Sequence, residues 1–209
     1  MSEPAGILGG TFDPPHWGHL TAAREIRKAL GLAEVFLMPN RIPPHKPPAT
    51  ASDADRLAMI RLICGEYPEF RCLDTELRRQ GSSYLADTLL LLRQEPLFKS
   101  RGIIFIIGAD SLQTLHTWSR PGVILENCSL AVACRPGYSL STVSDLVRAR
   151  ITSQEDFDPG RSGQILLLDT SPMDISSTFL RAHPETISPM TVPEPVAAYI
   201  RKHHLYHHD

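Results

Sequence analysis

The chain has 209 residues, 42% of them hydrophobic, and a formal net charge of −2, which is typical of one folded domain and excludes a mainly disordered chain. Its 21 Lys and Arg against 23 Asp and Glu lack the basic excess of a general nucleic-acid or membrane-surface binder, although a local basic pocket stays open. No apolar run could cross a bilayer, no signal peptide begins the sequence, and the four scattered cysteines form no Cys-x-x-Cys pair, so we expect a cytoplasmic protein with reduced thiols.

The first half of the chain alternates apolar runs with segments of helical periodicity. The apolar runs predict strands at residues 5–10, 33–39 and 70–77. The periodic segments predict helices at residues 18–31, 53–67 and 83–95, and a proline-rich loop covers residues 40–52.

The ends of these helices carry residues that commonly cap or terminate a helix. Gly31 suits the C-terminal end of the first helix. We expect Ser52 or Asp53 to cap the second helix and Ser82 or Ser83 to cap the third. The second helix should turn its apolar face inward, with the residues Leu57, Ile60 and Ile63 or Cys64.

The second half of the chain continues the same alternation. Strands are predicted at residues 101–110, 127–137 and 163–169, and the unbroken Ile and Phe run of the first suits a parallel strand that is covered on both faces. Residues 138–163 are polar and irregular. Helices are predicted at residues 111–118, 143–150, 176–183 and 193–205, the last with proline near its start.

Strands that alternate with helices at this spacing predict an α/β fold, in which right-handed crossovers wind a parallel sheet. Ligands of such sheets bind beyond the carboxyl ends of the strands. We therefore look for function in the loops that follow the predicted strands.

The strongest local signal is GGTFDPPHWGHL, residues 9–20, between the first predicted strand and the first helix. Gly9 and Gly10 allow a ligand to approach the backbone, and the following helix can offer its amides to negative oxygens. His16 and His19 would share one face of a turn, and Gly18 between them leaves room for a base or a phosphate. The motif is neither a dinucleotide fingerprint nor a Walker loop. By itself it also fits two polar histidines in a turn, or a metal site that lacks an obvious third ligand.

A second signal is MDISSTFLR, residues 173–181, after the last predicted strand. The hydroxyls and amides of Ser176, Ser177 and Thr178 could cap a helix or hold phosphate, and Arg181 lies one turn later. Taken alone, this motif is also an ordinary helix cap.

Taken together, these two motifs resemble those of the nucleotidyltransferase superfamily. The string GGTFDPPHWGHL is similar to that of the bacterial nicotinate-nucleotide adenylyltransferases, and further blocks of that family follow in the same order. These blocks are PNRIPPHK (39–46), SSYLADTL (82–89), FIIGADSL (105–112), Thr117-Trp118, CRPGY (134–138) and PEPVAAYI (193–200). The resemblance implies a Rossmann-like, doubly wound parallel sheet in a single domain over residues 1–209. A small helical C-terminal portion would begin near residue 170 and carry the second phosphate site.

The resemblance also implies a reaction. The family transfers AMP from ATP to nicotinate mononucleotide and releases deamido-NAD and pyrophosphate. The attacking phosphate is largely dianionic at pH 7 and needs no general base, so the residues must hold two polyanions in line and neutralise the leaving charge. Mg2+ would be bound through the ATP phosphates.

Residues that match the family's ATP site are assigned on that basis. His16, His19 and Arg181 would be catalytic, His19 at the α-phosphate, His16 at adjacent oxygens and Arg181 on the β- and γ-phosphates. Asp110 would accept hydrogen bonds from the ribose, or else cap a helix. The remaining ATP-binding candidates are Gly9, Gly10, Gly18, Gly108, Ile175, Ser176 and Ser177.

The mononucleotide site is assigned by the same resemblance. Trp118 matches an aromatic that stacks on the pyridine ring. Leu85 stands where the family commonly has Thr; recognition of the carboxylate by a backbone amide tolerates this change, whereas recognition by a hydroxyl would alter the preference for acid over amide. The other candidates are Thr11, Phe12, Asn40, His45, Lys46, Ser83, Tyr84 and Arg135.

Other interpretations stay open at this point. The chain could act on nicotinamide mononucleotide, FMN or pantetheine phosphate as a sister nucleotidyltransferase, could bind nucleotides without catalysis, or could bind metal through its nine histidines. We expect ATP and nicotinate mononucleotide as partners, no nucleic acid and no membrane, and leave a homo-oligomer open.

Overall fold

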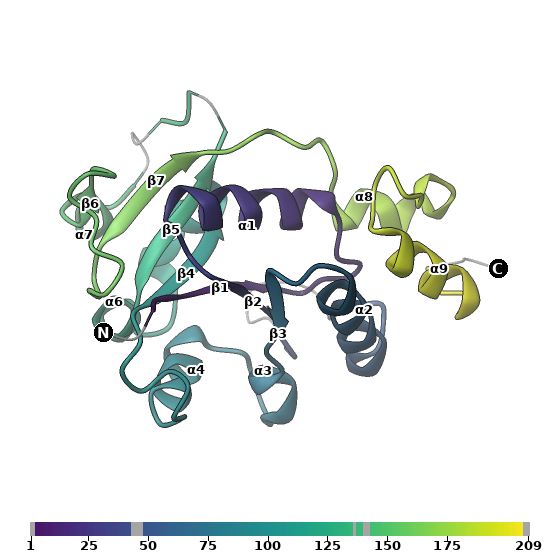
Figure 1. The fold of residues 1–209 in the computed structure, drawn as a ribbon, viewed down its shortest axis with the longest axis horizontal. Coiled ribbons are helices and arrows are strands. Elements are labelled where there is room, and N and C mark those ends of the chain that lie inside the picture. Colours follow the sequence, from purple (N-terminus) through teal and green to yellow (C-terminus); the bar gives the residue numbers. More distant parts are fainter. Residues whose placement is uncertain (1–2, 43–47, 136, 140–142, 207–209) are drawn as a thin grey trace.

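The computed structural model describes residues 3–42, 48–135, 137–139 and 143–206 (Figure 1). Within these residues seven parallel strands form one sheet in the order β3-β2-β1-β4-β5-β7-β6. The strands are β1 (Ala5–Gly10), β2 (Val35–Pro39), β3 (Phe70–Cys72), β4 (Ile103–Gly108), β5 (Ser129–Cys134), β6 (Ile151–Thr152) and β7 (Ile165–Asp169). The predicted α/β fold with a parallel sheet is confirmed.

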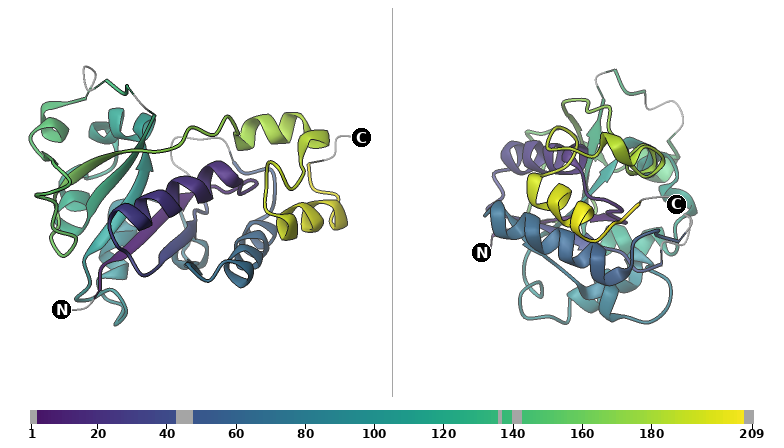
Figure 2. Two further views of the ribbon diagram at one scale, coloured as in Figure 1. Left: turned by 45° about the horizontal axis from the view of Figure 1, so that its top comes forward. Right: turned by 90° about the vertical axis from the view of Figure 1, so that its right-hand side faces the viewer.

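Helices cover both faces of the sheet (Figures 1 and 2). The longer ones are α1 (Trp17–Ala29), α2 (Asp53–Glu66), α4 (Leu85–Leu92), α6 (Pro121–Asn127) and α9 (Glu194–Lys202). The shorter ones are α3 (Thr75–Arg78), α5 (Ala109–Gln113), α7 (Asp145–Arg148), α8 (Ser177–Ala182) and the 3-10 turns η1 (Leu115–Thr117) and η2 (Pro184–Thr186). Helices α3 and α6, the turn η2 and strand β6 are elements that the sequence did not predict. Strand β3 ends at Cys72, and α3 covers the end of the segment 70–77, where the expected strand leads into a turn.

The two faces of the sheet have separate cores because neighbouring residues of a strand point to opposite sides. In β1, Leu8 belongs to the core under α1, α2 and α9, whereas Ile7 belongs to the core under α4 and α6. In β4, Ile104 and Phe105 divide in the same way. This division explains the unbroken apolar run of β4 and confirms the doubly wound arrangement.

Helix ends agree with the sequence at two places. Gly31 has a φ of 61°, its amide donates to Lys28 O and the Leu32 amide donates to Arg27 O, which is the Schellman arrangement expected for a terminating glycine. Ser52 caps α2, with its side-chain oxygen accepting from the Asp55 amide at 3.1 Å.

Two local predictions are wrong, and in both cases tertiary contacts explain the difference. Helix α4 is preceded by Tyr84 and has no serine cap, because the Ser83 hydroxyl instead accepts from the Arg41 amide at 2.9 Å. In α2 the buried positions include Arg56 and Met59, and Leu57 is only half-buried.

The winding of the chain reverses beside β1. The strands proceed from β1 to β2 and β3 on one side, and the chain then returns to pair β4 with the other side of β1. The crossover that leaves β1 and the one that leaves β4 run in opposite directions. A crevice therefore stays uncovered at the carboxyl ends of these two strands. Figure 2 shows that α8 and α9, which follow the last strand, lie together at one end of the molecule.

Gly9 lies in β1 where a side chain would clash. A Cβ atom there would come within 2.6 Å of the Phe105 Cζ atom, so Gly9→Ala should push the Phe105 ring and destabilise the protein by about 1–2 kcal/mol. Thermal unfolding should show a lower Tm, and Phe105→Leu in the same chain should restore it. Gly65→Ala in α2 is the control, because a Cβ atom there meets nothing within 4 Å and the helix gains about 1 kcal/mol. An unchanged Tm for Gly9→Ala would contradict this packing.

Candidate functional site

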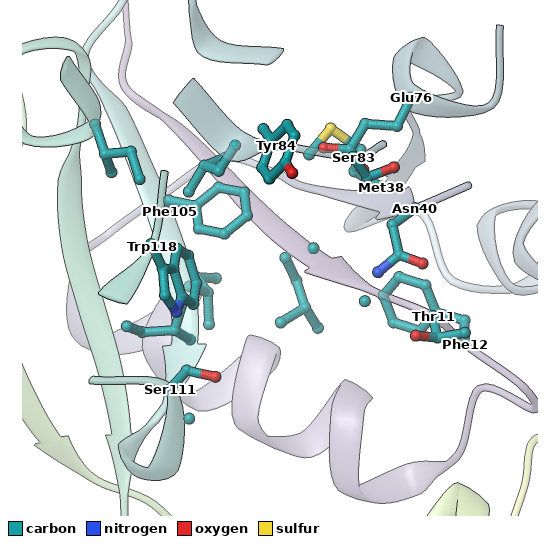
Figure 3. Close-up of a pocket in the computed structure, with 18 of the residues that line it drawn as sticks. Thr11, Phe12, Met38, Asn40, Glu76, Ser83, Tyr84, Phe105, Ser111 and Trp118 are labelled. Atoms are coloured by element: carbon teal, nitrogen blue, oxygen red, sulfur yellow. The ribbon is translucent and has the colours of Figure 1, made fainter. Parts of the chain in front are cut away.

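A cavity of about 590 Å³ opens at the carboxyl ends of β1, β2 and β4 (Figure 3). It lies at the reversal of winding, where parallel sheets commonly bind ligands. Twelve of the predicted site residues line it: Gly9, Gly10, Thr11, Phe12, His19, Asn40, Ser83, Tyr84, Leu85, Gly108, Trp118 and Ser177. Segments from the start, the middle and the end of the chain thus meet around one space.

The histidine pair forms where β1 runs into α1. His16 precedes the first turn of α1, and its amide lies 3.3 Å from His19 Nδ1, to which it donates a hydrogen bond. The two rings lie with centroids 3.8 Å apart, and Phe12 contacts the His19 ring edge-on. Because Nδ1 of His19 accepts, the neutral ring carries its proton on Nε2. His19 lines the cavity, and His16 lies behind it.

His16 is buried and neutral. Its exposed fraction is 6%, and burial lowers its pKa from 6.5 to about 4. Its Nδ1 has no hydrogen-bond partner within the described part of the chain. A buried polar nitrogen without a partner costs free energy, which a ligand can recover by bonding to it. The sequence expected room for a ligand at Gly18, but a Cβ atom there would come within 3.0 Å of the His16 ring, so Gly18 makes room for His16.

The C-terminal motif reaches the same region through α8. Ser176 caps α8 by accepting from the Phe179 amide at 3.1 Å, and Ser177 donates its hydroxyl proton to Pro14 O at 2.9 Å. Arg181 Nη1 donates to Asp13 O at 2.7 Å, and its side chain stays 26% exposed. Arg181, Ser176 and Ile175 do not line the cavity themselves, although Ser177 does.

The opposite wall of the cavity is built from the ends of β2 and β4 and from α4. Met38, Phe105, Tyr84, Leu85 and Trp118 give it an aromatic and apolar character (Figure 3). Such a wall suits a flat ring of limited polarity.

Polar atoms without partners lie in this region of the structure. Thr11 Oγ1 and Asn40 Oδ1 are buried, and neither has a hydrogen-bond partner among the described residues. Both residues line the cavity. Two orphaned polar atoms in a ligand-sized space mark positions where a bound molecule would supply the missing hydrogen bonds.

A second hollow of about 390 Å³ lies beyond the ends of β4 and β5. Gly108 lines both spaces, and Asp110 and Arg135 line only this one. Arg135, predicted beside the mononucleotide, therefore lies with the predicted ribose residue instead. Asp110 is in the first turn of α5 and does not precede it, so it is not the residue that caps this helix. His45 and Lys46 fall outside the described residues.

Sequence reasoning missed several residues that shape the site. Arg56 is fully buried and donates to Thr11 O and Asn40 O, each at 2.7 Å, which ties the ends of β1 and β2 together. Glu76 lines the cavity and accepts from the Thr88 hydroxyl at 2.7 Å; burial raises its pKa. For Arg56 the only sequence signal was a charged residue on the inward face of a predicted helix, which does not identify its partner; Glu76 lay in a segment that was not predicted as a helix.

The described residues contain no group of three His, Cys, Asp or Glu side chains that could hold a metal ion. In the same part of the chain no helix is long and apolar enough to span a membrane.

These features define a nucleotidyltransferase of the Rossmann-like class: the winding reverses beside β1, a cavity lies at the reversal, and a histidine pair stands at the start of α1. The sequence profile of the cytidylyltransferase-like family matches residues 7–183. Relatives of nearly the same length carry the name "Probable nicotinate-nucleotide adenylyltransferase". The protein of Aeromonas hydrophila is 42% identical over 212 residues, which covers 99% of this chain and 98% of the relative. The protein of Shewanella woodyi is 39% identical over 206 residues, which covers 96% and 98%. The chain therefore belongs to the cytidylyltransferase-like family, and within it to the nicotinate-nucleotide adenylyltransferases.

Solved structures agree on the fold. The nicotinic acid mononucleotide adenylyltransferase of Plasmodium falciparum, complexed with NaAD, superposes with a TM-score of 0.73 at 16% identity and covers 98% of each chain. The same enzyme complexed with APC superposes with a TM-score of 0.71. At this identity the likeness supports the Rossmann-like sheet and leaves the roles of individual residues to be tested.

The neutral state of His16 should make stability depend on pH. The unfolded chain binds a proton at this residue below pH 6.5 and the folded protein only near pH 4, so stability should fall by about 3 kcal/mol as pH drops across that window. His16→Gln should flatten the fall of Tm between pH 6.5 and pH 4. His183→Gln is the control, because the His183 side chain is 50% exposed. Equal slopes for wild type and His16→Gln would contradict the burial of a neutral imidazole.

Proposed function

We propose that the protein transfers AMP from ATP to nicotinate mononucleotide and forms deamido-NAD and pyrophosphate. The observation that carries the proposal is the single cavity that joins His19 and Ser177 on one side to Asn40, Tyr84 and Trp118 on the other. A phosphate-binding wall and a ring-binding wall around one space allow two nucleotides to meet end to end. The names of the full-length relatives support the same substrates.

The reaction requires positioning more than proton transfer. An oxygen of the mononucleotide phosphate attacks the ATP α-phosphorus, the bond to the β-phosphate bridging oxygen breaks, and pyrophosphate leaves with that electron pair. The attacking phosphate is already ionised at neutral pH, so no side chain needs to remove a proton. The residues act by holding the two phosphates in line and by stabilising the charge that moves to the leaving group.

On the phosphate side we assign the catalytic roles to His16, His19 and Arg181. His19 would donate to the α-phosphate, and the guanidinium of Arg181, held on the loop after β1, would receive the β- and γ-phosphates. His16 is neutral without ligand, and a phosphate beside its orphaned Nδ1 would raise its pKa and favour the charged form. Gly9, Gly10, Ile175, Ser176 and Ser177 complete this proposed ATP site, and Gly18 contributes by leaving room for the His16 ring.

On the acceptor side the proposal uses the apolar wall and the orphaned polar atoms. Trp118 would stack on the pyridine ring, and Thr11 Oγ1 and Asn40 Oδ1 would bond the ribose phosphate portion. Ser83, Tyr84 and Leu85 would face the pyridine substituent, with Phe12 at the other end of the wall. His45 and Lys46 stay proposed residues of the loop over the mononucleotide.

We assign the adenosine portion of ATP to the second hollow. Gly108 connects it to the main cavity, and Asp110 there would accept hydrogen bonds from the ribose hydroxyls, with Arg135 nearby for phosphate. Mg2+ would enter as part of the substrate, Mg-ATP, held by phosphate oxygens and water. All four cysteines are free thiols, which supports the proposed cytoplasmic setting.

Release of pyrophosphate from Mg-ATP tests the proposal directly. We expect release with nicotinate mononucleotide and at least a tenfold lower kcat/KM with nicotinamide mononucleotide, because a carboxylate gains more from backbone donors than an amide does. Turnover with the amide at an equal rate would make the enzyme dual-specific. No release with either acceptor, while FMN or pantetheine phosphate supports it, would replace the proposal with a sister activity, and ATP binding without any turnover would leave a binding protein.

His19→Ala and Trp118→Ala should separate the two walls of the cavity. Loss of a donor to the reacting phosphate should lower kcat by about 10²–10³-fold in His19→Ala. Loss of the stacking surface in Trp118→Ala should raise the KM of the mononucleotide about tenfold and leave that of ATP within about twofold. Steady-state kinetics with each substrate varied measures both, and each variant is the control for the other. An equal loss of ATP binding in Trp118→Ala would show that the residue is structural.

A further inference from the structure

The Asp13 carboxylate lies in the loop between β1 and the histidine pair and accepts hydrogen bonds from two distant segments. It is 2% exposed. The amides of Thr50 and Ala51, just before α2, donate to it at 2.7 and 3.0 Å. The Tyr206 hydroxyl, past the end of α9, donates to Asp13 Oδ1 at 2.8 Å. A buried carboxylate is stabilised only when such donors surround it, so these contacts hold the loop in one position.

The backbone of the same loop carries the second phosphate motif. Asp13 O accepts from Arg181 Nη1, and Pro14 O accepts from the Ser177 hydroxyl. His16, two residues after Pro14, directly precedes α1. A displacement of residues 13 and 14 would therefore move Arg181, Ser177 and the histidine pair together.

Tyr206 is built into the fold in an unusual way. Its φ is 68°, in the left-handed region that is unfavourable for a residue with a Cβ atom, and it is 5% exposed. Contacts of its side chain must compensate for that backbone conformation. Burial and the neighbouring Asp13 carboxylate raise the pKa of the Tyr206 hydroxyl, so it stays a donor.

The C-terminal portion thus reaches the site from outside the cavity. Figure 1 shows α9 beside α2 and close to α8, the helix that carries Ser177 and Arg181. Tyr206 does not line the cavity. Its hydrogen bond to Asp13 is its direct link to the loop, and the Asp13 carboxylate in turn lies 3.8 Å from Arg181 Nη1.

We propose that Tyr206 and Asp13 are positioning residues, whose hydrogen bond fixes the loop of residues 11–16 and thereby aligns Arg181 and the histidine pair for transfer. This inference rests on the proposed function and names residues that nothing in that proposal uses. A role in alignment affects the transition state more than substrate binding, so it should appear in kcat.

Tyr206→Phe removes one hydroxyl and leaves the ring in place. We expect kcat for pyrophosphate release to fall about tenfold, with both KM values within about twofold, because reacting groups that are slightly misplaced lose rate steeply. Tyr199→Phe is the matched control: the Tyr199 hydroxyl donates to Asp55 Oδ1 at 2.9 Å, so the substitution removes a tyrosine–aspartate bond of the same C-terminal portion without touching the loop. Its kcat should stay at the wild-type value.

A double-mutant cycle shows whether the effect passes through Asp13. With Asp13→Asn already present, Tyr206→Phe should change kcat by less than about twofold, because the two residues act as one unit. The Tm of every variant is measured, and rates are compared well below the lowest value. A wild-type protein that releases no pyrophosphate would overturn both the proposed function and this inference. If the wild type is active and Tyr206→Phe keeps kcat within about twofold of it, the inference alone is overturned. The same holds if the effects of Asp13→Asn and Tyr206→Phe on kcat are fully independent.

Discussion

The site depends on the reversal of winding between β1 and β4. Crossovers that leave β1 in one direction and return to its other side cannot cover the carboxyl ends of both strands. Glycines stand at both ends, Gly9 and Gly10 in β1 and Gly108 in β4, and the first two leave room for the Phe105 and Phe12 rings that line the cavity. Gly108 lines both hollows, and a Cβ atom there would meet nothing within 4 Å. Sheet topology thus places the cavity, and the glycines at the strand ends let aromatic rings pack along its wall.

The charged and titratable groups around the site are paired within the protein, neutral, or partly exposed to water. The buried cation Arg56 is used within the protein, where two backbone carbonyls and Asp53 accept from it. His16 avoids a buried unpaired charge by remaining neutral. Arg181 keeps part of its surface in water. With a net charge of −2, the protein would therefore bind the triphosphate of the proposed reaction through local donors, since it has no basic excess overall.

The sequence predicted the sheet well and the side-chain network poorly. Long apolar runs such as 101–110 and 163–169 can be recognised as strands from the sequence alone, so β4 and β7 were predicted. Strand β6 has two residues, too few for a period, and is set by pairing with β7. The wrong cap of α4 has the same origin, because the Ser83 hydroxyl bonds to the loop at Arg41.

Most of the candidate site residues line one cavity. The resemblance to a family predicted that residues 9–20 and 173–181 belong to one site, whereas the hydrophobic periodicity of the sequence could not have predicted it. Arg56, Glu76 and Tyr206 were missed because their partners are chosen by packing, and Tyr206 lies 193 positions from Asp13.

The departure at Leu85 shows how such a site can keep its chemistry while its side chains vary. Tyr84 and Leu85 line the cavity at the start of α4, and the Tyr84 side chain, which precedes the helix, makes no capping hydrogen bond. The first amides of a helix point away from it and lack partners within it, so they can bind a carboxylate whatever side chain follows Tyr84. Recognition by the backbone would be insensitive to the exchange of a hydroxyl for an isobutyl group, provided that the helix starts at the same residue. In this protein the start of α4 is held by Ser83, whose hydroxyl is bonded to the Arg41 amide, and by the Thr88 hydroxyl, which is bonded to Glu76. In the function proposed above, the selectivity of the acceptor site would therefore depend on contacts behind the helix, and the residue at position 85 would need only to fit the apolar wall.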